Sequence, residues 1–126
     1  MQPISTDAAP AAIGPYSQAI FVDGWVFCSG QIPLDPATGA LVEGDITAET
    51  QRVMANLDAV LQAAGATFSD VVRTTIYLTD LANFAQVNAA MARCFNEPYP
   101  ARATVQVSAL PRGALVEIDA VLVDAR

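Results

Sequence analysis

The chain has 126 residues, of which 53% are apolar, and its formal net charge at pH 7 is −7 because 13 acidic residues outnumber six basic ones. It contains no histidine and no lysine. This excludes Ser-His-Asp and Cys-His catalysis, histidine metal sites and lysine Schiff bases. Nucleic-acid-binding proteins present clusters of basic residues, and this chain has none, so we expect no nucleic-acid partner. The length fits one domain, residues 1–126.

The N-terminal sequence MQPISTDAAP has neither the basic region nor the apolar run of a signal peptide. No apolar run reaches the ~18 residues of a membrane-spanning helix. We therefore expect a cytoplasmic protein without a membrane partner.

Cys28 and Cys94 lie far apart and outside any CxxC motif, which favours buried, reduced thiols over catalytic ones. A metal site built from carboxylates alone stays open at this point, but the acidic residues are scattered without a ligand-spaced cluster, so we expect no metal.

The first half of the chain predicts a hairpin followed by a helix. Two alternating apolar runs within residues 16–32 flank Asp23 and Gly24, a pair that strongly favours a two-residue hairpin turn. After a loop rich in proline and glycine, apolar residues recur at helical spacing over 45–64, and Gly65 is placed to end that helix.

The second half predicts three strands and one helix. Residues 70–80 are rich in β-branched side chains, as in a strand. Apolar residues at steps of three and four predict a second amphipathic helix over 81–95; they are Phe84, Val87, Met91 and Phe95. Residues 102–107 and 114–123 predict the last two strands, joined through a turn at 110–113.

The resulting order is β-β-α-β-α-β-β, an α+β fold in which two helices cover one face of a mixed sheet. No third helix remains to cover the other face. Association of identical copies through that face is the simplest way to bury it, so we expect a homo-oligomer.

Arg102 stands where a polar loop meets a predicted strand. Beyond it, apolar residues alternate with Thr104 and Gln106, the pattern of a strand with one buried face. An isolated arginine at a strand end is most often solvated. Alternatively, its planar guanidinium could clamp a carboxylate. The residues alone leave both interpretations open.

Glu117 and Asp119 lie on the last predicted strand, among aliphatic residues. Alternation places Val116, Ile118 and their period-two neighbours on one face and the two acids on the other. The acids could be solvated and discourage edge pairing. Alternatively, a partly desolvated Glu117 with a raised pKa could position a water molecule.

Two further features lie near the predicted hairpin. Tyr16 follows the rigid pair Gly14-Pro15, where a tyrosine is more often a packing anchor than an acid. Ser29 and Gly30 end the second predicted strand. Glycine allows a ligand to approach the backbone closely, although most such pairs are only turns.

Several segments together resemble the RidA (YjgF) family of imine deaminases. They are IGPYSQA, CSGQIPLDPATG, TIYLTDLANFAQVN, YPAR and VEIDAV, in the family's order and spanning about residues 9–123. The resemblance implies a chorismate-mutase-like α+β domain assembled as a trimeric barrel, with a site at each subunit interface. It also implies cofactor-free hydrolysis of 2-enamino and 2-imino acids, such as 2-aminoacrylate and 2-iminopropionate, to 2-keto acids and ammonia.

The resemblance also implies roles for individual residues. It assigns carboxylate binding to Arg102 and water positioning to Glu117, and it places substrate-binding groups at Tyr16, Ser29 and Gly30. Asn88 matches a frequent family asparagine, read as structural or site-supporting. At residue 104 the family commonly has cysteine, and the threonine here raises the question of whether backbone or side chain binds substrate.

Two other functions remain as alternatives. The interfacial cleft could bind small carboxylates without turnover. The chain could also be an endoribonuclease, which its acidic composition and lack of histidine make the weakest hypothesis.

Overall fold

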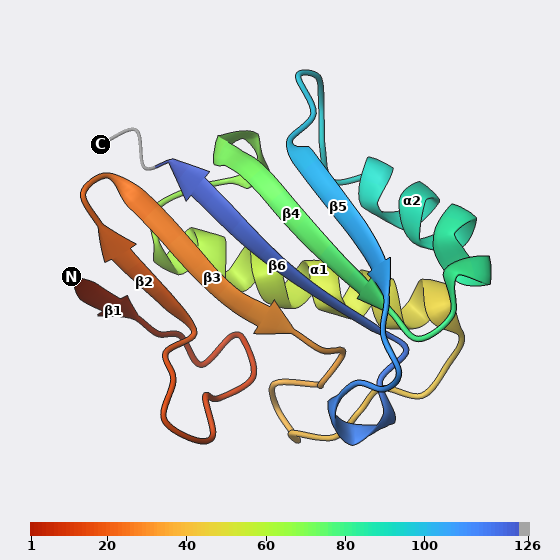
Figure 1. The fold of residues 1–126 in the computed structure, drawn as a ribbon. Helices are drawn as coiled ribbons and strands as arrows, with labels where there is room; N and C mark the ends of the chain where they lie inside the picture. Colours follow the sequence, from red (N-terminus) through yellow and green to blue (C-terminus); the bar gives the residue numbers. More distant parts are fainter. Residues whose placement is uncertain (124–126) are drawn as a thin grey trace.

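The computed structural model describes residues 1–123, which form one mixed sheet with helices on one face (Figure 1). The six strands are arranged in the order β1-β2-β3-β6-β4-β5, and of these neighbours only β4 and β5 are parallel. Their bounds are Gln2–Ile4 for β1, Ala19–Val22 for β2, Trp25–Gln31 for β3, Val71–Leu78 for β4, Ala101–Gln106 for β5 and Val116–Val123 for β6.

Two α-helices pack on the sheet, α1 over Ile46–Ala63 and α2 over Phe84–Ala92. Asp45 caps α1 by accepting a hydrogen bond from the backbone N–H of Ala48 at 3.0 Å. Gly65 follows the helix with a φ of 75°, a left-handed conformation that glycine adopts without a Cβ clash. The predicted end of the first helix is therefore confirmed. Three short 3-10 turns complete the elements: η1 (Phe68–Asp70), η2 (Leu81–Asn83) and η3 (Pro111–Gly113).

The predicted hairpin is also confirmed. Asp23 and Gly24 have φ values of 51° and 81°, and Val22 pairs with Trp25 across the turn. Positive φ at both central residues is the geometry that matches the twist of the two strands.

The hydrophobic core lies between the sheet and the helices. Alternate residues of β6 face it, as predicted: Val116, Ile118, Ala120 and Leu122 are buried. The buried stripe of α1 packs against them and contains Val53, Leu57, Val60 and Leu61.

Several boundaries differ from those expected from the sequence. The N-terminal strand β1 was not predicted; it pairs antiparallel with β2. The second helix was expected over 81–95, but its start is the 3-10 turn η2 and it ends at Ala92. The last strand begins at Val116 rather than at residue 114.

The orientation of β5 corrects the interpretation of this segment as a strand that buries its apolar side. Arg102, Thr104 and Gln106 alternate on the side facing the helices, because they pair in register with the buried Thr74, Ile76 and Leu78 of β4. The intervening apolar residues point the other way, and Val105 is 41% exposed. Apolar and polar residues alternate along β5 as predicted, but the apolar residues face the uncovered side of the sheet.

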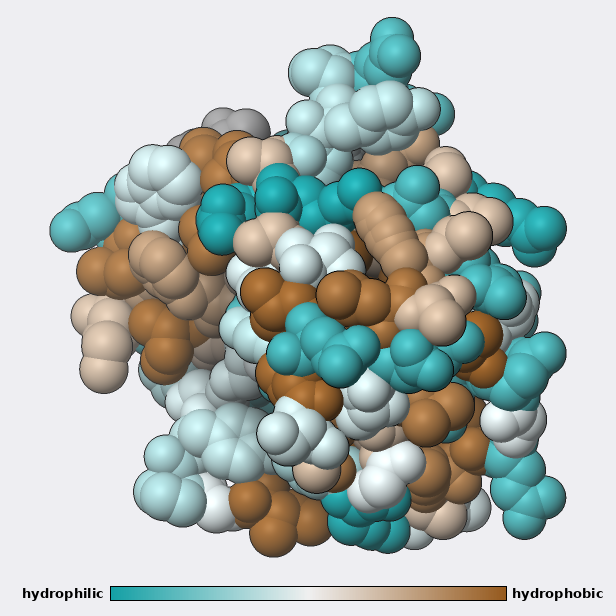
Figure 2. All heavy atoms as spheres, turned by 45° about the vertical axis from the view of Figure 1, so that its right-hand side comes forward, coloured by the Kyte–Doolittle hydropathy of each residue, from teal (hydrophilic) through white to brown (hydrophobic). Residues whose placement is uncertain are grey.

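The uncovered face of the sheet carries large apolar side chains. Trp25 and Phe27 of β3 are 43% and 47% exposed, and their neighbours along the strand, Val26 and Cys28, are buried. Figure 2 shows apolar side chains gathered on the left of the molecule, around the hairpin of β2 and β3. Within residues 1–123, neither helix is long and apolar enough to cross a membrane.

Candidate active site

Arg102 is held by helix α2 rather than left as a free strand end. Its Nη1 donates a hydrogen bond to Oδ1 of Asn88, and its Cζ lies 5.1 Å from the ring centroid of Phe84. Both partners come from α2, whose position on the sheet therefore fixes the direction of the guanidinium. Asn88 thus supports the arginine, as its match to the family suggested. The side chain of Arg102 remains exposed and can reach a ligand.

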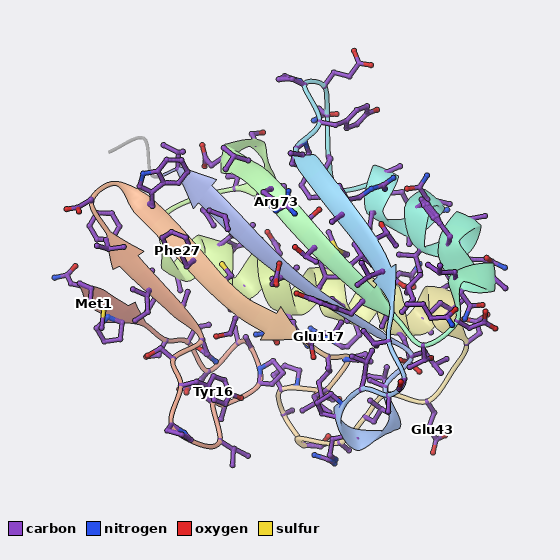
Figure 3. All side chains as sticks on the ribbon, in the orientation of Figure 1. Met1, Tyr16, Phe27, Glu43, Arg73 and Glu117 are labelled. Atoms are coloured by element: carbon purple, nitrogen blue, oxygen red, sulfur yellow. The ribbon has the colours of Figure 1, made fainter. Side chains whose placement is uncertain are left out.

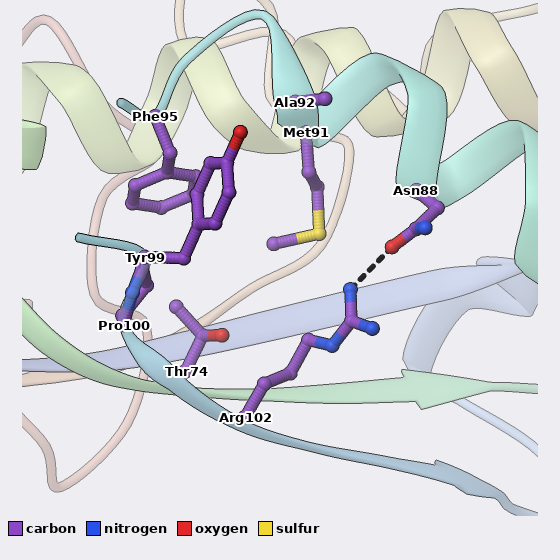
Figure 4. Close-up of a pocket in the computed structure, with 8 residues that line it drawn as sticks. All are labelled: Thr74, Asn88, Met91, Ala92, Phe95, Tyr99, Pro100 and Arg102. Atoms are coloured by element: carbon purple, nitrogen blue, oxygen red, sulfur yellow. Dashed lines mark hydrogen bonds between the residues drawn. The ribbon is translucent and has the colours of Figure 1, made fainter. Parts of the chain in front are cut away.

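A pocket of about 570 Å³ opens beside this guanidinium, between α2 and strands β4 and β5 (Figure 4). Arg102 and Asn88 form its polar end, and Phe95 and Tyr99 form its apolar end, with Met91 and Thr74 between them. Ala92 and Pro100 complete the lining. A pocket of this size, with a few polar groups in an apolar wall, is typical of a small-molecule site.

Glu117 lies on the opposite face of the sheet. It pairs in register with Tyr77 of β4, and on its other side lies Gly30 of β3. The register of β3 against β6 shifts between Cys28 and Gln31, a β-bulge that brings Gly30 against the carboxylate. A Cβ on Gly30 would lie only 2.5 Å from Oε2 of Glu117. A side chain at residue 30 would therefore displace the carboxylate of Glu117 from this position.

Burial raises the pKa of Glu117 above its ordinary value, and the nearby charge of Asp119 raises it further. Asp119 itself is fully engaged: Oδ1 accepts from the backbone N–H of Thr75 and Oδ2 from the hydroxyl of Tyr77, both at 3.2 Å. Burial and Asp119 also raise the pKa of Tyr77, which keeps its phenol protonated. Of the two alternatives for Glu117, the geometry favours the partly desolvated acid.

Tyr77 was not identified as a site residue from the sequence. It lies in a β-branched strand without any distinguishing motif, and only the pairing of β4 with β6 brings it beside Glu117. The sequence offered one indication: Tyr77 lies two residues after Thr75 on the same strand, so the two side chains share one face of the sheet.

The loop that carries Tyr16 is tied to the same region. Oγ of Ser29 donates to the carbonyl of Ser17 at 2.6 Å, and the backbone N–H of Ser29 donates to the carbonyl of Gln18 at 2.9 Å. Tyr16 is 54% exposed, so it is not a packing anchor within this chain. Figure 3 shows Glu117 near the end of β3 and Tyr16 beyond the start of β2.

Gln18 fixes the other side of this loop and was also missed. It is 4% exposed; its Oε1 accepts from the N–H of Thr6 at 2.7 Å, and its Nε2 donates to the carbonyl of Pro10 at 2.7 Å. A buried glutamine that satisfies backbone groups in this way holds an irregular segment in one conformation.

The candidate residues therefore form two groups within one chain. Tyr16, Ser29, Gly30 and Glu117 are connected through β3, β6 and the loop before β2. Arg102 and Thr104 lie on the helix side of β5. Oγ1 of Thr104 is buried and has no hydrogen-bond partner within residues 1–123. The sheet separates the two groups.

Neither a metal site nor a reactive thiol is found in the part of the chain that the structure describes. No group of three or more histidine, cysteine, aspartate or glutamate side chains in residues 1–123 could hold a metal ion. Burial raises the pKa of Cys28 to about 12, and burial likewise raises the pKa of Cys94. Both thiols therefore stay protonated and poorly nucleophilic at neutral pH.

Comparison with known proteins gives consistent matches along nearly the whole chain. Residues 6–123 match the family described as Endoribonuclease L-PSP. Protein DfrA of Myxococcus xanthus is 62% identical over 122 residues, which cover 95% of this chain and 93% of that protein. The human 2-iminobutanoate/2-iminopropanoate deaminase is 47% identical over 120 residues, 95% of this chain and 88% of that protein.

The fold matches as closely. The crystal structure of RidA from an Antarctic Psychrobacter superposes with a TM-score of 0.94 at 48% sequence identity, covering 98% of this chain and 99% of that one. The resemblance drawn from the sequence motifs is thereby confirmed. The chain belongs to the Endoribonuclease L-PSP family, which is the RidA (YjgF) family.

Proposed function

We propose that this protein hydrolyses reactive 2-imino and 2-enamino acids to 2-keto acids and ammonia without a cofactor. The observation that carries the proposal is the guanidinium of Arg102, held by Asn88 and Phe84 at the mouth of a pocket. A planar guanidinium in that position can bind a carboxylate through two parallel hydrogen bonds. Relatives at 47–50% identity are named 2-iminobutanoate/2-iminopropanoate deaminase, which supports this reaction class.

The site requires more than one copy of the chain. Arg102 lies on the helix side of the sheet and Glu117 on the uncovered side, so one substrate can meet both only if a neighbouring copy supplies one of them. The exposed Trp25, Phe27 and Val105 give the uncovered face the apolar character of an association surface. We propose a homotrimer with one site at each interface, as the family resemblance implies.

The chemistry uses groups that the composition leaves available. Arg102 holds the substrate carboxylate, and the backbone at Gly30 and Thr104, with Tyr16 and Ser29, fixes the substrate plane. Glu117 takes a proton from a water molecule, whose oxygen bonds to the imine carbon while the C=N π electrons move to nitrogen. The carbinolamine that forms then expels ammonia, with the proton returned from Glu117 to nitrogen, and its hydroxyl becomes the keto oxygen after losing its own proton.

The raised pKa of Glu117 suits this role because a base whose pKa lies nearer neutrality transfers protons in both directions more readily. An enamine substrate must first gain a proton at its β-carbon. The resulting C=N⁺ is already electrophilic, so orientation and one water suffice, and no metal or other cofactor is needed.

The acidic composition argues against an endoribonuclease despite the description attached to the family. A net charge of −7 and only six basic residues give no basic surface for an RNA backbone.

The test is a coupled assay in which an amino-acid oxidase generates the imine and semicarbazide traps what remains. We expect the protein to lower the trapped amount, and Glu117→Gln to reduce turnover by ~10²–10⁴-fold while still binding the 2-keto product. Product affinity is measured by calorimetry on the same variant.

Binding without turnover in the wild-type protein would leave the small-carboxylate binder as the function. Equal rates for Glu117→Gln and wild type would remove Glu117 from the mechanism.

A further inference from the structure

The pocket beside Arg102 is larger than a 2-iminopropanoate molecule needs. Its volume of about 570 Å³ falls in the range of sites for drug-sized ligands, roughly 300–1,000 Å³. Beyond the polar end formed by Arg102 and Asn88, its wall is Met91, Phe95 and Tyr99 (Figure 4). Methionine and aromatic side chains offer an adaptable apolar surface for a ligand of matching character.

Thr74 supplies a second, independent indication of a ligand. It is 1% exposed, it lines the pocket, and its Oγ1 is buried without a hydrogen-bond partner in the described part of the chain. Buried hydroxyl groups are normally paired, because an unpaired one has lost its water without replacement. Thr74 is in register with Arg102 across β4 and β5, so its hydroxyl lies on the same side of the sheet as the guanidinium.

We propose that this pocket is the side-chain subsite of the enzyme, and that it selects 2-imino acids with long aliphatic or aromatic side chains over the alanine-derived imine. Thr74 donates a hydrogen bond to the ligand carboxylate that Arg102 holds, and the ligand's side chain lies against Met91, Phe95 and Tyr99. The inference rests on the proposed function, since it names the substrate class of that same site.

The expected preference is large enough to measure. One methylene added in a hydrophobic pocket is worth about 10- to 200-fold in kcat/KM. We therefore expect the imines derived from leucine, methionine and phenylalanine to exceed the alanine-derived imine by at least ~10-fold in kcat/KM. The imines are generated with an amino-acid oxidase, and their loss is followed by semicarbazide trapping.

Ala92 allows the pocket to be filled without disturbing the core. It lines the pocket at the end of α2 and is exposed, so a larger side chain there can project into the cavity. Ala92→Phe should lower the ratio of kcat/KM for the leucine-derived imine to that for the alanine-derived imine by ~10-fold or more. Ala89→Phe is the matched control: it is exposed on the same helix, is not part of the lining, and should leave that ratio unchanged.

The role of Thr74 is tested with Thr74→Val, which has the same shape without the hydroxyl. Loss of one hydrogen bond to a charged carboxylate should weaken binding of pyruvate and of 4-methyl-2-oxopentanoate alike, by roughly 10- to 150-fold in calorimetry. A hydroxyl with a purely structural role would leave both affinities unchanged, and that result would overturn the assignment of Thr74 to the carboxylate.

The outcomes separate the two proposals. A wild-type enzyme that hydrolyses the alanine-derived imine as fast as the larger ones, with Ala92→Phe lowering all rates equally, overturns the subsite and leaves the deaminase intact. A wild-type protein that hydrolyses no imine, but binds 4-methyl-2-oxopentanoate more tightly than pyruvate and loses that preference in Ala92→Phe, overturns the deaminase and supports the subsite.

Discussion

The side chain of Arg102 shows how an exposed cation can be fixed by a hydrogen bond and an aromatic ring. Asn88 accepts its hydrogen bond, and the ring of Phe84 lies beneath its guanidinium at 5.1 Å from the centroid. A guanidinium that is already oriented loses less conformational freedom when it binds a carboxylate. Sequence alone left Arg102 between a solvated residue and an anion clamp, because neither partner on α2 is close to it in the chain.

Replacement of Arg102 tests the clamp directly. Loss of a charge-assisted hydrogen bond costs roughly 1.5–3 kcal/mol, so Arg102→Ala should lower kcat/KM by about 10- to 150-fold or more. Arg102→Lys should restore little, because an ammonium group cannot reproduce the fork. The fold should persist in both variants, since the residue is exposed, and circular dichroism checks this. Arg93→Ala, which removes an exposed arginine just after α2, is the control; wild-type activity in Arg102→Lys would contradict the two-pronged clamp.

Gly30 is predicted to be as sensitive as the charged residues. In Gly30→Ala the new methyl would lie 2.5 Å from Oε2 and 2.9 Å from Cδ of Glu117, so the carboxylate must move. The conformation of Gly30 is not a left-handed one, and the chain should still fold. Imine hydrolysis should fall by ~10²-fold or more, because a displaced base cannot reach the water.

Binding provides the internal control for this variant. Arg102 still holds the carboxylate and the backbone N–H of residue 30 remains in this variant, so the affinity for pyruvate should fall less than the rate of imine hydrolysis. A Gly30→Ala enzyme with full activity would show that Glu117 tolerates displacement and is not the base.

At the scale of helices and strands, the sequence predicted the features that depend on a few neighbouring residues. The Asp23-Gly24 turn and the Gly65 end of α1 each depend on a few consecutive residues, and both were found as expected. The strand β1 was missed because its three residues gain their structure only from pairing with β2. The face of β5 was misjudged because its apolar side serves a surface outside the chain's own core.

A contact between α1 and the start of β6 shows the same dependence on long-range pairing. Glu49 of α1 is 4% exposed, and its Oε1 accepts a hydrogen bond from the backbone N–H of Leu115 at 2.8 Å. Burial raises the pKa of this carboxyl, although the hydrogen bond from Leu115 lowers it somewhat. The folded state therefore binds the proton of Glu49 more tightly than the unfolded state does.

This raised pKa predicts a pH-dependent effect on stability. A carboxyl whose pKa is raised on folding contributes stability below its ordinary value of 4.5 and loses that contribution as the pH rises through the folded-state pKa. Glu49→Gln keeps an oxygen for Leu115 and cannot ionise. Its free energy of unfolding relative to wild type should therefore increase between about pH 4 and about pH 7.5, as measured by urea denaturation. Glu43→Gln, at an exposed position, is the control; a constant difference for Glu49→Gln would contradict the effect.

For the whole molecule, the sheet divides the candidate site. The motifs predicted the site residues, yet no periodicity in the sequence could reveal that Arg102 and Glu117 face opposite ways, because the face on which a strand's side chains lie depends on its partner strands. The uncovered face was anticipated from the number of helices, and its exposed Trp25 and Phe27 agree with that expectation. From these two facts together we propose that a neighbouring copy completes the site, and mixing inactive chains tests this.

Arg102→Ala and Glu117→Gln should each have strongly reduced activity alone, yet regain activity when mixed. If Arg102 of one copy works with Glu117 of the next around the ring, every mixed trimer contains one site with both residues intact, where a Glu117→Gln chain supplies Arg102 and an Arg102→Ala chain supplies Glu117. Random exchange of subunits in an equal mixture should make about one quarter of all sites complete, and hence recover about one quarter of wild-type activity.

Unfolding and refolding the variants together drives the exchange, and light scattering checks that the mixture has the mass of a trimer. Refolding each variant separately before mixing is the control and should recover little. If both residues acted from the same chain, every site would lack one of them and the mixture would stay inactive, whereas a monomer mass would remove the interfacial site altogether.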